Sequence, residues 1–236
     1  RKQQLKDERY HASEAAAGPS PTAPADGQVA CTVHMLPGGG PRCKVAVSQT
    51  PLFTADDCAE AIRMAEAHAE AGGGWTTQRH HAVPTTDIPI HEVPELLGWF
   101  NRALRGRIAP VLAANFGDTL PTPSALRVHD AFLVRYSASG GQAHLPMHTD
   151  ESMISLTIVL NDGFAGGGTF FADLRTALSP PVGHVIAFDG HALHGGEPIV
   201  RGTRYIVAAF LYVDRTDEDD ALMATAAPRG GEPSRL

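Results

Sequence analysis

The chain has 236 residues, 43% of them hydrophobic and 19% charged, a composition that excludes disorder throughout and fits one folded domain with a substantial core. Its 19 Lys and Arg residues against 26 Asp and Glu give a net charge of -7, which argues against a mainly electrostatic grip on nucleic acid or anionic lipid. No segment approaches the roughly 20 apolar residues that a membrane-spanning helix needs.

The first segment, residues 1–50, opens with a charged run and passes into a stretch rich in Ala, Pro, Gly and Ser. This composition is typical of an arm or linker. Because residue 1 is Arg and not Met, we expect a processed or excised piece, and an upstream signal peptide or anchor is left open. Cys31 and Cys43 flank a turn-rich stretch, which is compatible either with a hairpin disulfide or with two thiols.

A helical pattern follows residue 53. Thr54 and the two aspartates after it resemble an N-cap with an acidic first turn, and apolar residues then repeat at helical spacing until three glycines at 72–74. Cys58 lies on the apolar face of this helix and is expected to be a buried thiol. A second helix is predicted to begin near Pro94 and to be ended or kinked by Pro110.

After residue 123 the apolar period changes from helical to two, which predicts strands. The predicted strands cover 128–136, 154–160, 169–171, 185–188 and 204–213. Helices followed by many short strands favour an α+β fold whose β part is a sandwich or barrel. We therefore expect the domain to span residues 51–214, with residues 215–236 as an acidic and then Ala-, Pro- and Gly-rich tail.

His148 and Asp150 form the strongest local signal for chemistry, since residues two apart on a strand point to the same face. With one more His from another strand they would form the two-His, one-carboxylate set that holds Fe(II) by one face and leaves the others open for substrate and dioxygen. His144 and His148 also have the spacing of a helical zinc site, but Pro146 between them disfavours a helix.

Two histidines, His191 and His194, are candidates for the second imidazole. Arg204 lies ten residues after His194, and a short loop between antiparallel strands would bring its guanidinium beside the metal. Its rigid bidentate fork suits the far carboxylate of a dicarboxylate cosubstrate that chelates the iron at its other end. This order favours His194 as the ligand and leaves His191 as a loop residue near the site.

The ordered motifs resemble the Fe(II)- and 2-oxoglutarate-dependent dioxygenases, and within them the prolyl 4-hydroxylase and procollagen lysyl hydroxylase branch. The matching segments are 148–152, 157–161, 166–170, 194–198 and 202–206, and the resemblance covers roughly residues 52–213. It implies a double-stranded β-helix (jelly roll) core with supporting helices on its N-terminal side.

The resemblance also implies roles for six residues. The iron ligands would be His148, Asp150 and His194, and the contacts to 2-oxoglutarate would come from Arg204, Tyr136 and Thr157. Arg at the carboxylate-binding position is typical of the lysyl hydroxylase branch, whereas many prolyl 4-hydroxylases carry Lys. Thr157 departs from the Asn that lysyl hydroxylases typically carry, which weakens any transfer of substrate identity.

The implied activity is hydroxylation of an unactivated C–H bond of a peptidyl lysine or proline, with 2-oxoglutarate and dioxygen as cosubstrates, succinate and CO2 as products, and ascorbate as a reductant. The alternatives are hydroxylation of a free amino acid or other small molecule, and a catalytically inactive jelly roll that only binds a partner. A nucleic-acid demethylase is disfavoured because those enzymes usually carry a second Arg where this chain has Phe210. The likeness and a Cys31–Cys43 bridge would both favour the secretory pathway over the cytoplasm.

Substrate specificity is expected in loops around the mouth of the barrel, here residues 75–89. The motif Arg79-His80-His81 in this loop is either a polar surface segment or part of a substrate lid. The glycine run at 166–168 is either a simple turn or a place where backbone approaches the site closely.

Overall fold

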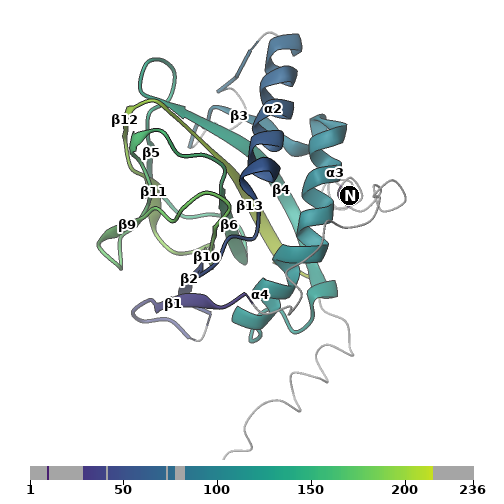
Figure 1. Ribbon diagram of the computed structural model, residues 1–236. Helices are drawn as coiled ribbons and strands as arrows, with labels where there is room; N and C mark the ends of the chain where they lie inside the picture. The colour runs from purple at the N-terminus through teal and green to yellow at the C-terminus, as the bar shows by residue number, and fades with distance from the viewer. Residues whose placement is uncertain (1–9, 11–28, 41, 73, 78–82, 215–236) are drawn as a thin grey trace, which may run out of the picture.

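The computed structural model describes residues 10, 29–40, 42–72, 74–77 and 83–214. It contains two main antiparallel sheets and a group of helices (Figure 1). The predicted tail and the Arg79-His80-His81 motif lie outside the described residues. Among those residues, no helix is both long and apolar enough to cross a membrane.

The larger sheet, called here the major sheet, has seven strands. Their order is β1 (Cys31–Met35), β2 (Lys44–Ser48), β10 (Val185–Asp189), β6 (Ile154–Val159), β13 (Thr203–Val213), β4 (Leu126–Ser137) and β3 (Asp87–Pro89). Neighbouring strands such as β6 and β13 are far apart in sequence, as in a jelly roll and not in a simple meander.

The smaller sheet, the minor sheet, has the order β5 (Leu145–His148), β11 (His194–Gly196), β8 (Thr169–Phe171) and β9 (Thr176–Leu178). A separate pair joins β7 (Ala165–Gly166) to β12 (Ile199–Arg201). The α+β fold and its jelly-roll core are thus as predicted.

The helices cover one face of the major sheet (Figure 1). They are α2 (Ala55–Gly72), α3 (Pro94–Ala103) and α4 (Ala109–Asn115), with short 3-10 turns η2 (Ile90–Glu92) and η4 (Pro123–Ala125). The main core lies between them and the sheet, because alternate residues of β6 and β13 point to that side. The opposite face of the sheet therefore carries the residues that can line a pocket.

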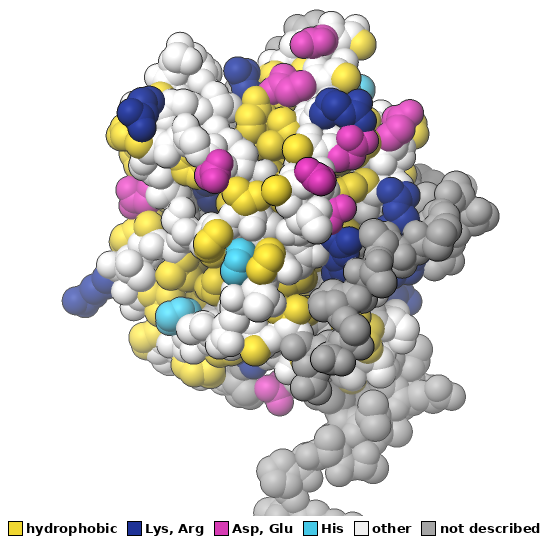
Figure 2. All heavy atoms as spheres, in the orientation of Figure 1, with side chains coloured by type: hydrophobic (Ala, Val, Ile, Leu, Met, Phe, Trp, Pro, Cys, Tyr) yellow, Lys and Arg dark blue, Asp and Glu magenta, His cyan; other side chains and the backbone are white. Residues whose placement is uncertain are grey.

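On the face shown in Figure 2, acidic side chains gather around α2, whereas hydrophobic side chains and histidines are exposed over the strands at the left of the view. Met147 in β5 and Leu193 next to β11 are each 44% exposed.

The second helix was expected to be ended or kinked by Pro110, and the structure rules out an end there. Instead of ending at Pro110, α3 continues through a π-helical turn, η3 (Leu104–Ile108), into α4, and Pro110 lies in the first turn of α4. A proline is tolerated in a first turn, since the N–H that it lacks needs no intrahelical partner there. The irregular turn before Pro110 thus allows the chain to remain helical.

The N-terminal region differs from the predicted arm or linker, because β1 and β2 fall within residues 1–50 and β2 pairs with β10 of the major sheet. Of the two possibilities left open for Cys31 and Cys43, the structure shows two thiols, since all three cysteines are free. Cys31 pairs with Ser48, whereas Cys43 lies beside Lys44, which pairs with Met35. Cys43 is therefore five residues along the chain from the position opposite Cys31, which separates the two cysteines by about 16 Å, whereas a disulfide needs Cα atoms within about 7 Å.

Candidate metal centre and cosubstrate pocket

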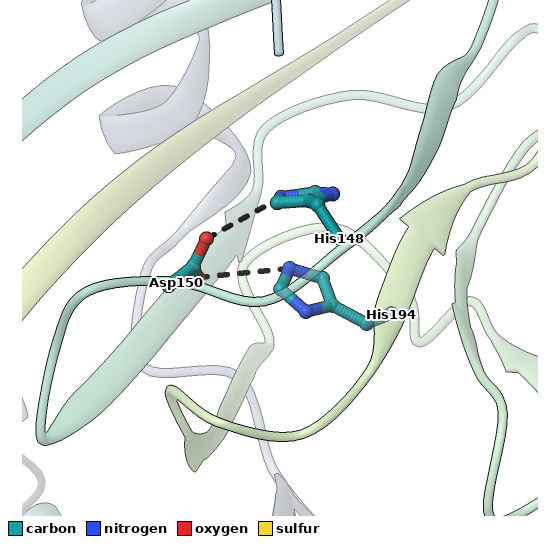
Figure 3. Close-up of side chains that lie close together, drawn as sticks. All are labelled: His148, Asp150 and His194. Atoms are coloured by element: carbon teal, nitrogen blue, oxygen red, sulfur yellow. Dashed lines mark ion pairs between the residues drawn. The ribbon is translucent and has the colours of Figure 1, made fainter. Parts of the chain in front are cut away.

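His148, Asp150 and His194 converge from three places in the fold (Figure 3). His148 ends β5, His194 begins β11, and the two are direct cross-strand partners in the minor sheet. Asp150 follows β5 in a loop. One ligand atom from each residue lies within 4.8 Å of the other two.

The distances fit ligands on one face of a single metal ion. His148 Nε2 lies 3.3 Å from Asp150 Oδ1, and His194 Nε2 lies 3.6 Å from Asp150 Oδ2. Two ligands at right angles, each about 2.1 Å from a metal, are separated by about 3 Å. Two imidazoles and one carboxylate are the donor set of non-haem Fe(II) oxygenase sites, so the residues present fit that ion.

Backbone carbonyls orient both imidazoles. His148 Nδ1 lies 2.8 Å from the Pro146 carbonyl oxygen, and His194 Nδ1 lies 2.9 Å from that of Ala192. An Nδ1–H that donates to a carbonyl leaves Nε2 as the free lone pair, which is the usual arrangement around a metal-bound histidine. Both Nε2 atoms face Asp150.

The Asp150 loop is held by its surroundings. The Asp150 N–H donates to the Gly190 carbonyl at 2.8 Å, and the Ser155 hydroxyl donates to Asp150 Oδ2 at 2.5 Å. Gly190 allows this close approach, because a Cβ there would lie 2.2 Å from the Ser152 carbonyl oxygen. The carboxylate is thus fixed from both the backbone and the β6 side.

The ionisation of Asp150 and His194 also suits a cation, whereas that of His148 depends on its contact with Asp150. Burial raises the pKa of Asp150, but the contacts with His148, His194 and Ser155 outweigh it and hold that pKa below its ordinary value. Burial lowers the pKa of His194 and favours the neutral imidazole that can bind metal. Burial acts in the same direction on His148, but hydrogen bonds with Asp150 and the Pro146 carbonyl outweigh it and raise the pKa.

The three side chains lie in a pocket of about 530 Å³, which Arg204 also lines. Arg204 is only 2% exposed, and among the described residues its Nε and Nη2 atoms have no hydrogen-bond partner. A buried guanidinium needs acceptors, since its desolvation is otherwise uncompensated. The pocket is therefore built to receive an anionic group at this end.

Tyr136 and Thr157, the other two predicted cosubstrate residues, are buried and line the same pocket. Tyr136 is the cross-strand partner of Arg204, whose guanidinium carbon lies 5.9 Å from the tyrosine ring centroid. Burial raises the pKa of Tyr136 to about 12, so its hydroxyl stays protonated and can donate a hydrogen bond.

Two histidines lie apart from the centre. His191 is an exposed loop residue whose ring contacts Asp189. It lies outside the metal cluster, in agreement with the spacing argument that favours His194 as the ligand. His144 precedes β5, and the strand conformation of residues 145–148 excludes a helical zinc site there.

A β-bulge supplies pocket residues that sequence reasoning missed. Phe210 pairs with Asp130 while Leu211 pairs with Val128, so His129 is an extra residue in β4. The alternation shifts at this point, and both His129 and Asp130 line the pocket. Asp130 lies on the face of Tyr136 by simple alternation, which could have revealed it, whereas His129 reaches the pocket only because of the bulge and has no simple sequence signal.

The glycine run belongs to the site. Gly166, Gly167 and Gly168 all have positive φ, and a Cβ on Gly167 would lie 2.6 Å from Ile199 Cδ1 and 3.2 Å from Arg204 Cδ. Of the two interpretations of this run, the close approach of backbone is the one that the structure shows, and it is directed at Arg204.

No family model matches the sequence. The chain is 31% identical over 176 residues to procollagen-lysine,2-oxoglutarate 5-dioxygenase 2 of Homo sapiens, an alignment that covers 68% of this chain and 23% of that protein. It is 32% identical over 127 residues to a PKHD-type hydroxylase of Xanthomonas campestris, covering 52% of this chain and 51% of the relative. Its relatives and structural neighbours are Fe(II)- and 2-oxoglutarate-dependent oxygenases.

Among solved structures, a prolyl 4-hydroxylase from Phytophthora capsici has the same oxygenase fold, with a TM-score of 0.51 and 16% identity over 75% of this chain and 65% of that one. The chain spans only about a quarter of the length of the human oxygenase relative. The His-Asp-His cluster described above is consistent with iron binding in this group of oxygenases.

Proposed function

We propose that the domain is an Fe(II)- and 2-oxoglutarate-dependent dioxygenase that hydroxylates an unactivated C–H bond of a peptidyl lysine or proline and releases succinate and CO2. One observation carries the proposal: the His148-Asp150-His194 cluster and the buried Arg204 guanidinium line a single pocket. A metal site alone would fit many activities, whereas a metal site with an anion receptor in the same pocket fits a dicarboxylate that spans both.

Each residue has a role in this proposal. His148, Asp150 and His194 would hold the iron, and the carbonyls behind the imidazoles would keep their Nε2 atoms directed at it. Arg204 would bind the distal carboxylate of 2-oxoglutarate, with Tyr136 and Thr157 beside it. Bound iron and 2-oxoglutarate supply the activation of dioxygen, which no protein side chain provides, and ascorbate is the expected reductant. The protein would contribute orientation and a pocket whose cosubstrate residues Arg204, Tyr136 and Thr157 are buried.

Two acidic side chains favour lysine as the peptidyl target. Asp130 and Glu151 line the pocket without belonging to the metal cluster. Carboxylates on a pocket wall attract an ammonium group and offer nothing comparable to the uncharged proline ring. A lysine-containing peptide should therefore be consumed faster than its proline counterpart, and mass spectrometry of both peptides after turnover tests this choice. Faster oxidation of a free amino acid than of either peptide would support the small-molecule alternative.

One of the two arguments for the secretory pathway no longer applies. The Cys31–Cys43 bridge is absent, and the relatives include both a human and a bacterial protein. The secretory pathway is therefore proposed on the likeness to lysyl hydroxylases alone.

The cofactor assignment is tested by an anaerobic titration of the metal-free protein with Fe(II) and then with 2-oxoglutarate. We expect a visible metal-to-ligand charge-transfer band that His194→Ala abolishes and Arg204→Ala weakens. His191→Ala is the matched control, since it removes a nearby exposed imidazole and should leave the band intact. A folded wild-type protein without the band would contradict the proposal and support the inactive binding module.

A further inference from the structure

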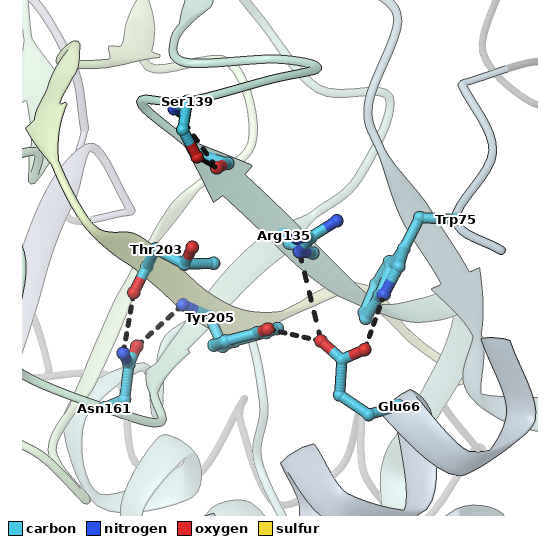
Figure 4. Close-up of polar contacts among 8 residues, drawn as sticks. Glu66, Trp75, Arg135, Ser139, Asn161, Thr203 and Tyr205 are labelled. Carbon is cyan, nitrogen blue, oxygen red and sulfur yellow. Dashed lines mark hydrogen bonds and ion pairs between the residues drawn. The ribbon is translucent and has the colours of Figure 1, made fainter. Parts of the chain in front are cut away.

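The backbone on both sides of Arg204 is held by one side chain, that of Asn161 (Figure 4). Its Nδ2 donates to the Thr203 carbonyl at 2.8 Å, and its Oδ1 accepts from the Tyr205 N–H at 2.7 Å. Thr203 and Tyr205 are the immediate neighbours of Arg204. The amide thus bonds to the chain just before and just after the guanidinium-bearing residue.

This contact replaces a missing length of strand. The ladder between β6 and β13 ends at the pair Val159 and Ile206, with one further bond from the Leu160 N–H to the Tyr205 carbonyl. Beyond it, the Asn161 side chain offers a donor and an acceptor in one plane, as a strand backbone does. On the other edge, Arg204 pairs with Tyr136 of β4. The start of β13 is therefore bonded on both sides at Arg204.

A second set of contacts anchors Tyr205 on the opposite face of the sheet. The Tyr205 hydroxyl donates to Glu66 of α2, which also accepts from Trp75 Nε1 at 3.0 Å. Arg135, the cross-strand partner of Tyr205, lies 3.9 Å from the same carboxylate. Because neighbouring strand residues alternate in direction, this cluster lies directly behind Tyr136 and Arg204.

We propose that Asn161 is a positioning residue for the cosubstrate carboxylate, acting through Arg204; this inference rests on the proposed function. Bidentate pairing of guanidinium and carboxylate depends closely on the placement of the fork. Arg204 has little room to adjust, since it is buried and its side chain packs against Gly167. A shift of its backbone is therefore transmitted to the bound carboxylate.

The test compares two 2-oxo acids that differ in the distal carboxylate. Protein loaded with Mn(II), a redox-inert stand-in for iron, is titrated by calorimetry with 2-oxoglutarate and with 2-oxobutyrate, which lacks that group. We expect Asn161→Ala to weaken the binding of 2-oxoglutarate about 10- to 100-fold, by analogy with the loss of residues that support metal ligands. The binding of 2-oxobutyrate should weaken less than about twofold. Asn161→Asp keeps the acceptor but directs an oxygen at the Thr203 carbonyl, so it should also weaken the binding of 2-oxoglutarate more than that of 2-oxobutyrate.

Three controls separate positioning from general damage. Asp162→Ala changes the exposed neighbouring side chain and should leave both affinities unchanged. In an Arg204→Ala background, Asn161→Ala should have no further effect on 2-oxoglutarate, because the group it positions is absent. Mn(II) affinity should be the same in all variants that keep the metal cluster.

The positioning role would be overturned if Asn161→Ala and Asn161→Asp lowered the affinities for both 2-oxo acids equally. It would also be overturned if Asn161→Ala lowered the affinity for 2-oxoglutarate as much in the Arg204→Ala background as in wild type. Either result would leave the proposed function intact. A wild-type protein that binds Mn(II) but neither 2-oxo acid would instead overturn the proposed function, and this inference with it.

Discussion

At the scale of single residues, the metal centre depends on groups that are not themselves metal ligands. The two histidines take their direction from backbone carbonyls, and Asp150 takes its direction from Ser155 and the Gly190 carbonyl. Such supporting bonds fix tautomer and orientation, and their loss typically lowers metal affinity by about 10- to 100-fold. Substitution of a supporting residue, and not only of a ligand, should therefore change metal affinity.

Ser155→Ala should weaken metal binding. The serine hydroxyl donates to Asp150 Oδ2 and helps to keep the pKa of that carboxyl low. Without it the carboxylate is freer to turn and easier to protonate, and we expect about a 10- to 100-fold loss of Mn(II) affinity. Competition with a chelator measures this. Ser139→Ala, in the loop after β4, is the control and should change nothing; equal affinity in wild type and Ser155→Ala would contradict the role of this bond.

Gly167→Ala should weaken 2-oxoglutarate binding more than Gly163→Ala does. The two glycines have nearly the same φ, +76° and +79°, so the backbone strain of an alanine is matched. A Cβ at Gly163 meets nothing within 4 Å, whereas one at Gly167 meets Ile199 and Arg204. We expect at least a tenfold loss of affinity for Gly167→Ala by calorimetry and a much smaller one for Gly163→Ala. Equal losses would assign the effect to strain alone.

At the scale of elements, the patterns that depend on near neighbours were predictable. The first helix was expected from its N-cap, acidic turn and apolar spacing, and α2 occupies that range. The order and spacing of His148, Asp150, His194 and Arg204 likewise indicated which residues the strands would bring together. The helix signal and the His148–Asp150 pair are each contained within a short segment, whereas His194 and Arg204 were selected by their order and spacing along the chain.

The features that sequence reasoning missed depend on partners far away in the chain. β1 and β2 are strands because β10 offers an edge to pair with, and β1 itself is mostly exposed, so its own pattern is weak. The bulge at His129 depends on the register between β4 and β13. Register is decided by the whole sheet, which a single segment does not encode.

The start of α2 illustrates how an element is stabilised from outside. Thr54 and Asp57 cap it reciprocally, each backbone N–H donating to the other's side chain at 3.0 Å. Arg107, from the π-helical turn η3, donates to Asp57 at 2.7 Å and to the Leu52 carbonyl at 2.9 Å. Because Arg107 is buried, loss of its carboxylate partner would leave a charge uncompensated.

Asp57→Ala should therefore lower the free energy of unfolding by about 2 kcal/mol at pH 7. Burial raises the pKa of Asp57, but the bonds with Arg107 and Thr54 outweigh it and lower the pKa below its unfolded value. The stabilisation is thus complete above the unfolded pKa and is lost as the pH falls through the folded one. In denaturant unfolding, the difference in the free energy of unfolding between wild type and Asp57→Ala should become smaller in acid. Asp56→Ala changes an exposed neighbour and should lower the free energy of unfolding by less than about 1 kcal/mol. A difference between wild type and Asp57→Ala that became larger in acid would contradict this account.

At the scale of the whole molecule, the two ends of the pocket belong to different sheets. His148 and His194 lie on the minor sheet, while Arg204, Tyr136 and Thr157 lie on the major sheet that the helices support. A cosubstrate that binds the metal at one end and Arg204 at the other would therefore join the sheets. Ligands that bind only the folded state add RT ln(1 + [L]/Kd) to its stability.

Metal and 2-oxoglutarate should accordingly stabilise the protein in two separable steps. Mn(II) alone at 100 times its dissociation constant should add about 2.7 kcal/mol to the free energy of unfolding, and 2-oxoglutarate at the same excess a similar further amount. At the concentrations set for wild type, Arg204→Ala should retain the metal increment and lose most of the second, whereas His194→Ala should lose both, since the 2-oxo acid needs the metal. Anaerobic denaturant unfolding with each ligand measures the increments. A full 2-oxoglutarate increment in Arg204→Ala would place the far carboxylate elsewhere, and the two sheets would then not be joined through this residue.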